Sequence, residues 1–380
     1  MARSTFAYAT PDVLRWARES SGYTVDEAAE KIGVRWLKLE MVEQGADRLT
    51  LRQAERAADV YERPLAALFL AEPPAEEPQE AQFRRLRDAP DLPWRPEMQL
   101  LVRRIRDRQE AAAELYEALD QPPPWPGAVM QFVAAEAADL PAIARAALAV
   151  SREEQRAWAA RDAYAPLRGW TDAVERLGAL VMQDGSMTVE EMRGFASVHD
   201  TVPVIVANSK DDPRARTFTV VHECGHLVLA ARGEPVGPDT ERWCNQFAGE
   251  VIMPKAWFAE AFRESAGRPL HARIDAVART FGVTPLAAAV RVAQTRIAPQ
   301  ADVDVVIAEL RERSATAAER KGGGGNYYLN TIAGLGPGFI RLVFSALDSQ
   351  AVTYPTASAL LGRVKVNHFE QLRDVLATRT

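Results

Sequence analysis

Apolar positions recur at helical spacing through the first part of the chain, in three short segments. Thr24 is followed three residues later by Glu27, a capping-box pattern that predicts a helix ending at Gly33. A second helix is expected over about 35–44, and a third begins after Thr50. The sequence therefore predicts a small N-terminal bundle of helices.

Segments rich in proline, glutamate or glycine divide the rest of the chain. AEPPAEEPQE (71–80) predicts a linker, and a helix ending near Leu119 meets the breaker QPPPWPG (121–127). Residues 128–176 are rich in alanine and are expected to be helical. SATAAERKGGGG (314–325) predicts a flexible linker to a C-terminal extension.

The hydrophobic period changes from helical to strand-like at two places. LGALVM (177–182) and VPVIVA (202–207) are short apolar runs bounded by turn-forming residues, which predicts strands. A helix carrying HECGH (222–226) follows, then a helix from about 240 to 252 and a helical region to about 297. The sequence therefore predicts a small β-sheet among helices.

Together these elements predict a mainly α fold of the α+β class. The C-terminal extension is expected to hold an apolar helix near 339–347 and a further helical pair. The predicted organisation has four parts: an N-terminal bundle (1–72), a linker with a basic connecting helix (73–127), an α+β domain with a small β-sheet (128–312), and a Gly-rich linker with a helical extension (313–380).

Composition narrows the classes of function. The net charge of −6 excludes a polycation that binds nucleic acid along its whole length, although residues 83–108 hold eight arginines against four acids. The sequence contains no run of about 18 apolar residues, the length that would predict a membrane-spanning helix. The N-terminus also lacks the apolar core of a secretory signal. Two cysteines form no disulfide framework, so a reducing cytoplasm is the expected location.

His222 and His226 stand four residues apart in the HECGH helix, a spacing that puts both rings on one face. Their nitrogens can then reach one cation at about 2.0–2.1 Å. Glu223, offset by about 100° around the helix, can reach water on that cation without binding it. The sequence therefore predicts a catalytic Zn²⁺ site with Glu223 as the general base.

A catalytic zinc needs a third protein ligand, and Asp239, Glu241 and Glu250 are the nearby candidates. We favour Glu241, because Asn245 follows one turn later and supplies an amide that can orient a ligating histidine. Glu250 lies about 180° around the same helix. Asp239 precedes the helix and is the weaker competitor.

The remaining histidines and both cysteines are expected to lie outside the metal site. His199, His271 and His368 each stand alone in the sequence. Cys224 lies about 200° around the helix from His222, so it points away from the metal, and Cys244 is expected to be a buried small apolar residue.

RTFTVVHECGHLVL, followed by ERWCNQFAGEVIMP, resembles the ImmA/IrrE family of metallopeptidases. The resemblance covers about 165–300 and implies a zincin-like domain in which His222, His226 and Glu241 bind zinc and Glu223 is the general base. Zinc would polarise the scissile carbonyl and activate water, and Glu223 would move the proton to the leaving amine. Strand 202–207 is a candidate sheet edge for pairing with an extended substrate.

TVDEAAEKIGVRWLKLEMVEQG (24–45) resembles the helix-turn-helix of the lambda-repressor-like (Xre) family. That resemblance implies DNA binding by the second helix. Residues 1–72 nevertheless contain ten lysines and arginines against twelve acids, a net charge of −2. The six groove-facing positions include three apolar residues and one acid, so a protein contact remains equally open: Arg35, Trp36, Leu37, Lys38, Glu40 and Met41.

The sequence leads to one principal functional hypothesis and two alternatives. The principal hypothesis is a zinc metallo-endopeptidase that cleaves a repressor or antitoxin-like protein and so controls gene expression, phage or mobile-element functions. The alternatives are a non-cleaving transcriptional regulator, whose peptidase-like domain holds zinc as a sensor, and a protein-interaction scaffold. Candidate partners are the protein substrate, DNA through the N-terminal domain, and a second copy of the chain as a homodimer, with no membrane.

Overall fold

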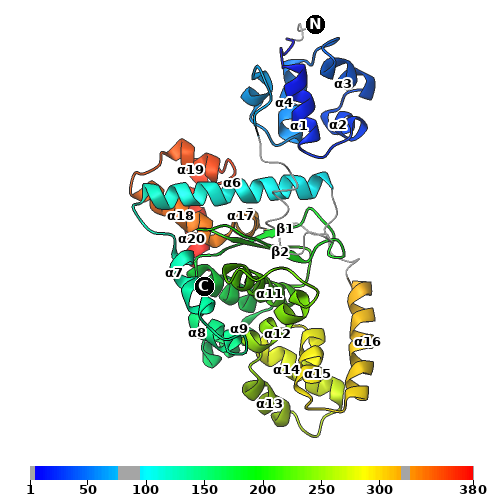
Figure 1. Ribbon diagram of the computed structural model, residues 1–380, viewed down its shortest axis with the longest axis vertical. Helices are drawn as coiled ribbons and strands as arrows, with labels where there is room; N and C mark the ends of the chain where they lie inside the picture. The colour runs from blue at the N-terminus through cyan, green and yellow to red at the C-terminus, as the bar shows by residue number, and fades with distance from the viewer. Residues whose placement is uncertain (1–4, 76–94, 318–325, 380) are drawn as a thin grey trace. The chain divides into compact units, whose positions relative to one another are not determined.

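The computed structural model describes residues 5–75, 95–317 and 326–379 (Figure 1). The chain forms two compact units, Met1–Asp107 and Arg108–Thr380. Both are built mainly from helices, and the described residues hold one three-stranded sheet in the larger unit. The predicted mainly α fold of the α+β class is confirmed.

The N-terminal unit packs short helices around an apolar core, as their spacing predicts. Thr24 and Thr50 each cap a helix through a complete capping box, and Gly33 ends the first of these helices in the left-handed conformation (φ 78°). The helical elements of this unit are α1 (Pro11–Glu19), α2 (Val25–Ile32), α3 (Trp36–Glu43), α4 (Leu51–Val60), η1 (Leu65–Phe69) and the first half of α6 (Pro96–Ala118).

A buried ion pair fixes α3 within the N-terminal unit. Arg18 of α1 donates from Nε to Glu43 Oε1 at 2.8 Å and from Nη2 to Glu43 Oε2 at 2.9 Å. Leu39 and Val42 are buried on the same side of α3. The opposite side of α3 is therefore left on the surface of this unit.

The sheet has the strand order β1-β3-β2. β1 (Leu180–Asp184) is parallel to β3 (Val204–Asn208), and β2 (Gly194–Ser197) is antiparallel to it. The prediction that strand 202–207 is a sheet edge is wrong, because β3 is the central strand and is paired on both sides. Its continuous apolar run is what a strand buried on both faces requires. The edge strand β2 was not predicted.

Helices cover both faces of the sheet (Figure 1). α10 (Ala165–Arg176) and the long helix α11 (Pro213–Ala231) pack on one face. α17 (Tyr327–Leu335), α18 (Pro337–Asp348) and the second half of α6 cover the other. The C-terminal extension is thus part of the layer that buries the sheet.

The other helices of the larger unit surround this sandwich. They are α7 (Pro124–Val133), α8 (Leu140–Ala147), α9 (Arg152–Arg161), α12 (Thr240–Ile252), α13 (Lys255–Glu264), α14 (Leu270–Phe281), α15 (Pro285–Thr295), α16 (Gln300–Ala317), α19 (Tyr354–Leu360), η4 (Val366–His368) and α20 (Phe369–Ala377). Among the described residues no single helix is long and apolar enough to span a membrane. Within the same part of the chain, α14 and α15 taken together meet that length and composition, with a bend of 106° between them.

Two predicted irregular segments differ from the structure at their ends. α7 begins at Pro124, inside the predicted breaker, because proline fits the first turn of a helix. α16 continues to Ala317, so residues 314–317 of the predicted Gly-rich linker are helical. Residues 76–94, which include the second half of the predicted linker and the start of the basic stretch, and residues 318–325 lie outside the described residues.

The carboxylate of Glu175 lies in the contact between α10 and α18. Its Oε1 accepts hydrogen bonds from the backbone N–H groups of Gly338 (3.0 Å) and Val181 (3.3 Å), and Arg341 donates to its Oε2 at 2.8 Å. Burial raises the pKa of Glu175 to about 7, although Arg341 and the backbone donors favour the charged form. The C-terminal extension therefore docks on a buried carboxyl group that titrates near neutral pH.

Glu175→Gln is expected to change how the free energy of unfolding depends on pH. The folded-state pKa is raised, so the stability contribution is fully present below about pH 4.5 and is lost as the pH rises to about 7. Between about pH 5 and about pH 8 the parent protein should lose about 2 kcal/mol relative to the variant in urea unfolding. The exposed control Glu117→Gln should follow the parent. A Glu175→Gln protein with the parent's pH dependence would contradict the assignment.

Candidate metal centre

α11 is buried on almost every side, which places its polar residues inside the protein. Asp212 caps the helix by accepting a hydrogen bond from Arg214 N at 2.8 Å, and Pro213 follows in the first turn. The sheet covers one side of α11 and α12 packs on another. His222, Glu223 and His226 therefore stand where an unsatisfied polar group is costly.

Gly225 allows α12 to approach α11 closely. A Cβ at this position would lie 3.0 Å from Phe247 Cδ1 and 3.4 Å from Cys244 Sγ, both on α12. Phe247 and Cys244 are themselves fully packed, so there is little room for them to retreat. The glycine between the two histidines thus sets the distance at which α12 presents its first turn, and Glu241 lies in that turn.

Three side chains from these two helices converge on one point. His222 Nε2 and His226 Nε2 are 3.1 Å apart. Glu241 directs Oε2 to His222 Nε2 at 3.3 Å and Oε1 to His226 Nε2 at 3.0 Å. The exposed fractions of the side chains are 11% for His222, 0% for His226 and 55% for Glu241. The group is closed at His226 and open to solvent at Glu241.

The donor group fits a zinc ion. Ligand atoms about 2.0–2.1 Å from a tetrahedral Zn²⁺ are about 3.3 Å from one another, close to the three separations found here. Two imidazoles and one carboxylate also form the ligand set of a catalytic zinc, which keeps its fourth position for water or substrate. His222, His226 and Glu241 can therefore hold a metal ion.

Glu223 lies between α11 and the start of the edge strand β2. A Cβ at Gly194 would lie 3.4 Å from Glu223 Oε1 and 2.7 Å from Val206 O, and would collide with Thr219 of α11. Only glycine lets the backbone of β2 come this close to the helix. The carboxylate of Glu223 therefore lies on the side of Gly194 to which a side chain would project.

The structure separates Glu241 from the other third-ligand candidates. Asp239 accepts a hydrogen bond from Arg242 at 2.6 Å, outside the donor group. Glu250 pairs with Arg291 and accepts from Lys255 N at 2.9 Å. Asn245 is exposed one turn after Glu241, and its predicted role in orienting a ligand stays a prediction.

The other histidines and both cysteines lie outside the donor group of the described residues, as the sequence predicts. His199 Nδ1 accepts from Thr201 N at 3.2 Å, His271 pairs with Glu309, and His368 Nδ1 lies 2.7 Å from Tyr328 Oη. Both cysteines are buried and are not joined in a disulfide: Cys224 and Cys244. Burial raises the pKa of the Cys224 thiol to about 12.

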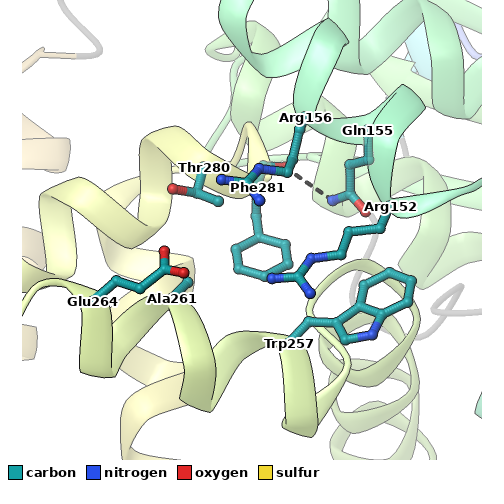
Figure 2. Close-up of a pocket in the computed structure, with 8 residues that line it drawn as sticks. All are labelled: Arg152, Gln155, Arg156, Trp257, Ala261, Glu264, Thr280 and Phe281. Atoms are coloured by element: carbon teal, nitrogen blue, oxygen red, sulfur yellow. Dashed lines mark hydrogen bonds between the residues drawn. The ribbon is translucent and has the colours of Figure 1, made fainter.

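A pocket between α9, α13 and α14 does not belong to this site. Figure 2 shows the Arg152 side chain extending into it beside Trp257 and Phe281. Arg152 already forms an ion pair with Glu260 at 2.9 Å. The pocket contains none of the metal-binding candidates or Glu223.

The predicted contact residues of the N-terminal unit lie on the surface of α3. Trp36 is 54% exposed, Leu37 45% and Met41 38%. Arg35, the residue before α3, is also exposed, and Lys38 donates to Gln53 of α4 at 3.2 Å. The predicted apolar surface is therefore present, while its partner stays a prediction.

A peptidase family model described as the IrrE N-terminal-like domain matches residues 174–293. The matched segment contains the complete donor group and Glu223, and it lies within the predicted α+β domain. It supports a metallopeptidase-like domain over this part of the chain. No curated protein and no solved structure matches the chain significantly.

His222→Ala and Glu241→Ala are each expected to abolish stoichiometric zinc binding, because a three-ligand site does not survive the loss of one ligand. Zinc per chain in the purified protein is the measurement. Glu250→Ala is the matched control on the same helix and should retain the metal. Loss of zinc in Glu250→Ala with retention in Glu241→Ala would show that the third ligand is misassigned.

Proposed function

We propose that the chain is a zinc-dependent metallopeptidase that cleaves a protein partner. The observation that carries this proposal is the convergence of His222, His226 and Glu241 at separations suited to one tetrahedral ion, with Glu223 buried beside them. The family match over residues 174–293 supports it independently.

The chemistry follows from the positions of the side chains. A zinc ion held by this donor group would lower the pKa of water and polarise the scissile carbonyl. Glu223 takes a proton from the attacking water and delivers it to the leaving amine. Its place one residue after His222 points it to the side of the donor group rather than into it.

The edge strand β2 offers a place for the substrate backbone. Asn208 N donates to Arg193 O at 2.8 Å, so Arg193 and Asn208 form a hydrogen-bonded pair of the antiparallel ladder. Such pairs alternate with non-hydrogen-bonded pairs, so the next hydrogen-bonded pair is Phe195 with Val206. Gly194, between them, directs its N–H and C=O away from β3 and is partly exposed. An extended substrate chain that pairs with Gly194 lies beside Glu223.

The proposed substrate is a repressor or antitoxin-like protein. This class rests on the resemblance of residues 24–45 to Xre-family regulators and on the exposed surface of α3, which can select a protein partner. The competing proposal is a non-cleaving regulator in which the same donor group holds zinc as a sensor. The two differ in whether Glu223 matters once zinc is bound.

Glu223→Gln is expected to retain zinc and to lose cleavage by a factor of about 100 or more, because an amide of the same size cannot accept the proton. The assay is cleavage of proteins encoded beside the gene, with zinc per chain measured on the same sample. Undiminished cleavage by Glu223→Gln would remove this residue from the mechanism. A parent protein that holds zinc and cleaves nothing would favour the sensor.

The partner of α3 can be identified by two variants. A protein partner buries the apolar side chains, so Trp36→Ala should weaken association with little salt dependence. A DNA partner would instead depend on Arg35→Ala/Lys38→Ala, with affinity that falls steeply as salt rises. We expect the first result in assays of self-association and DNA binding. Loss of sequence-specific DNA binding in the double variant, with Trp36→Ala unchanged in both assays, would contradict it.

A further inference from the structure

The side chain of Asn208 is hydrogen-bonded to both ends of the loop that leads into β2 (residues 185–193). It is fully buried at the end of β3. Its Nδ2 donates to the carbonyls of Met187 (3.2 Å), Thr188 (3.1 Å) and Met192 (2.7 Å), and its Oδ1 accepts from Lys210 N at 2.9 Å. One amide therefore joins the entry and the exit of this loop to the central strand.

The hydrogen bonds of Asn208 extend to the residue at which β2 begins. Besides the side-chain contacts, Asn208 N donates to Arg193 O, the residue just before Gly194. At the other end of β2, Gln109 of α6 donates to Ser197 O at 3.1 Å and accepts from Ser197 Oγ at 3.2 Å. The short strand is thus held at both ends, and Asn208 holds the end that lies against Glu223.

The loop carbonyls require a donor of this shape. Met187 and Met192 are buried, so their carbonyls carry a desolvation cost when they lose the Asn208 donor, and the loop would shift to find other donors. Gly194 follows the loop directly and fits between Val206 O and Thr219 with no spare room. A small displacement of the loop therefore moves the backbone of Gly194 relative to Glu223.

We infer that Asn208 is a positioning residue for the substrate: it fixes the backbone of Gly194 that pairs with the extended chain to be cleaved. This inference rests on the proposed peptidase function. Asn208 itself contacts neither substrate nor metal. It acts on substrate binding at β2, whereas zinc binding depends on α11 and α12.

The test replaces the amide while keeping its size. Asn208→Asp presents a carboxylate, which cannot donate to the three carbonyls, and Asn208→Ser, too short to reach them, serves if the first variant folds poorly. Asn330→Asp, at an exposed position of α17, is the matched control. Each protein is assayed for zinc per chain, for hydrogen exchange of residues 185–197, and for KM and kcat on a quenched fluorogenic peptide selected by cleavage with the parent.

Asn208 variants are expected to keep their zinc, to exchange faster over 185–197, and to show KM raised by about tenfold with kcat within about twofold. A purely structural role would lower the active fraction, and hence the apparent kcat, without moving KM. Unchanged KM in variants that cleave, or loss of zinc, overturns the positioning role alone. A parent protein that cleaves no peptide or protein contradicts the proposed function and the inference with it.

Discussion

The burial of α11 is the constraint on which the rest of the larger unit depends. A helix enclosed on almost every side leaves its polar residues little contact with solvent, yet this one carries two histidines and a glutamate in its middle. The neighbouring elements supply what solvent does not. α12 brings the Glu241 carboxylate to the two imidazoles, and the resulting group has the separations of a metal site.

Two glycines determine how closely the neighbours of α11 approach. Gly225 lies on the helix itself and admits Phe247 and Cys244 of α12. Gly194 lies on the edge strand and admits Thr219 of α11. Each contact controls one function of the site, because the first places the third metal-binding candidate and the second places the strand beside Glu223. A side chain at Gly225 would move α12 and its Glu241 without touching β2. A side chain at Gly194 would move β2 without touching α12.

Local features of the site were predictable, and the strand arrangement was not. The helical period alone places His222 and His226 on one face and sets Glu250 opposite Glu241, and the structure agrees with both. The capping boxes at Thr24 and Thr50 likewise depend on residues only three apart. By contrast β2 is four residues long, and its pairing with β3 depends on a register that no local pattern encodes. The burial of Glu175 depends on α18, more than 150 residues away in sequence.

The division of contacts within the site bears on whether the domain cleaves or only senses. Holding a metal ion requires α11 and α12, and nothing in that task requires a glycine in β2 or a buried amide that gathers the loop before it. The buried Asn208 side chain has four hydrogen-bond partners, so both its amide nitrogen and its amide oxygen are satisfied. The loop that it contacts leads into a partly exposed backbone edge near Glu223, with which an extended chain can pair. These contacts support the proposed hydrolysis over the competing proposal of a zinc sensor.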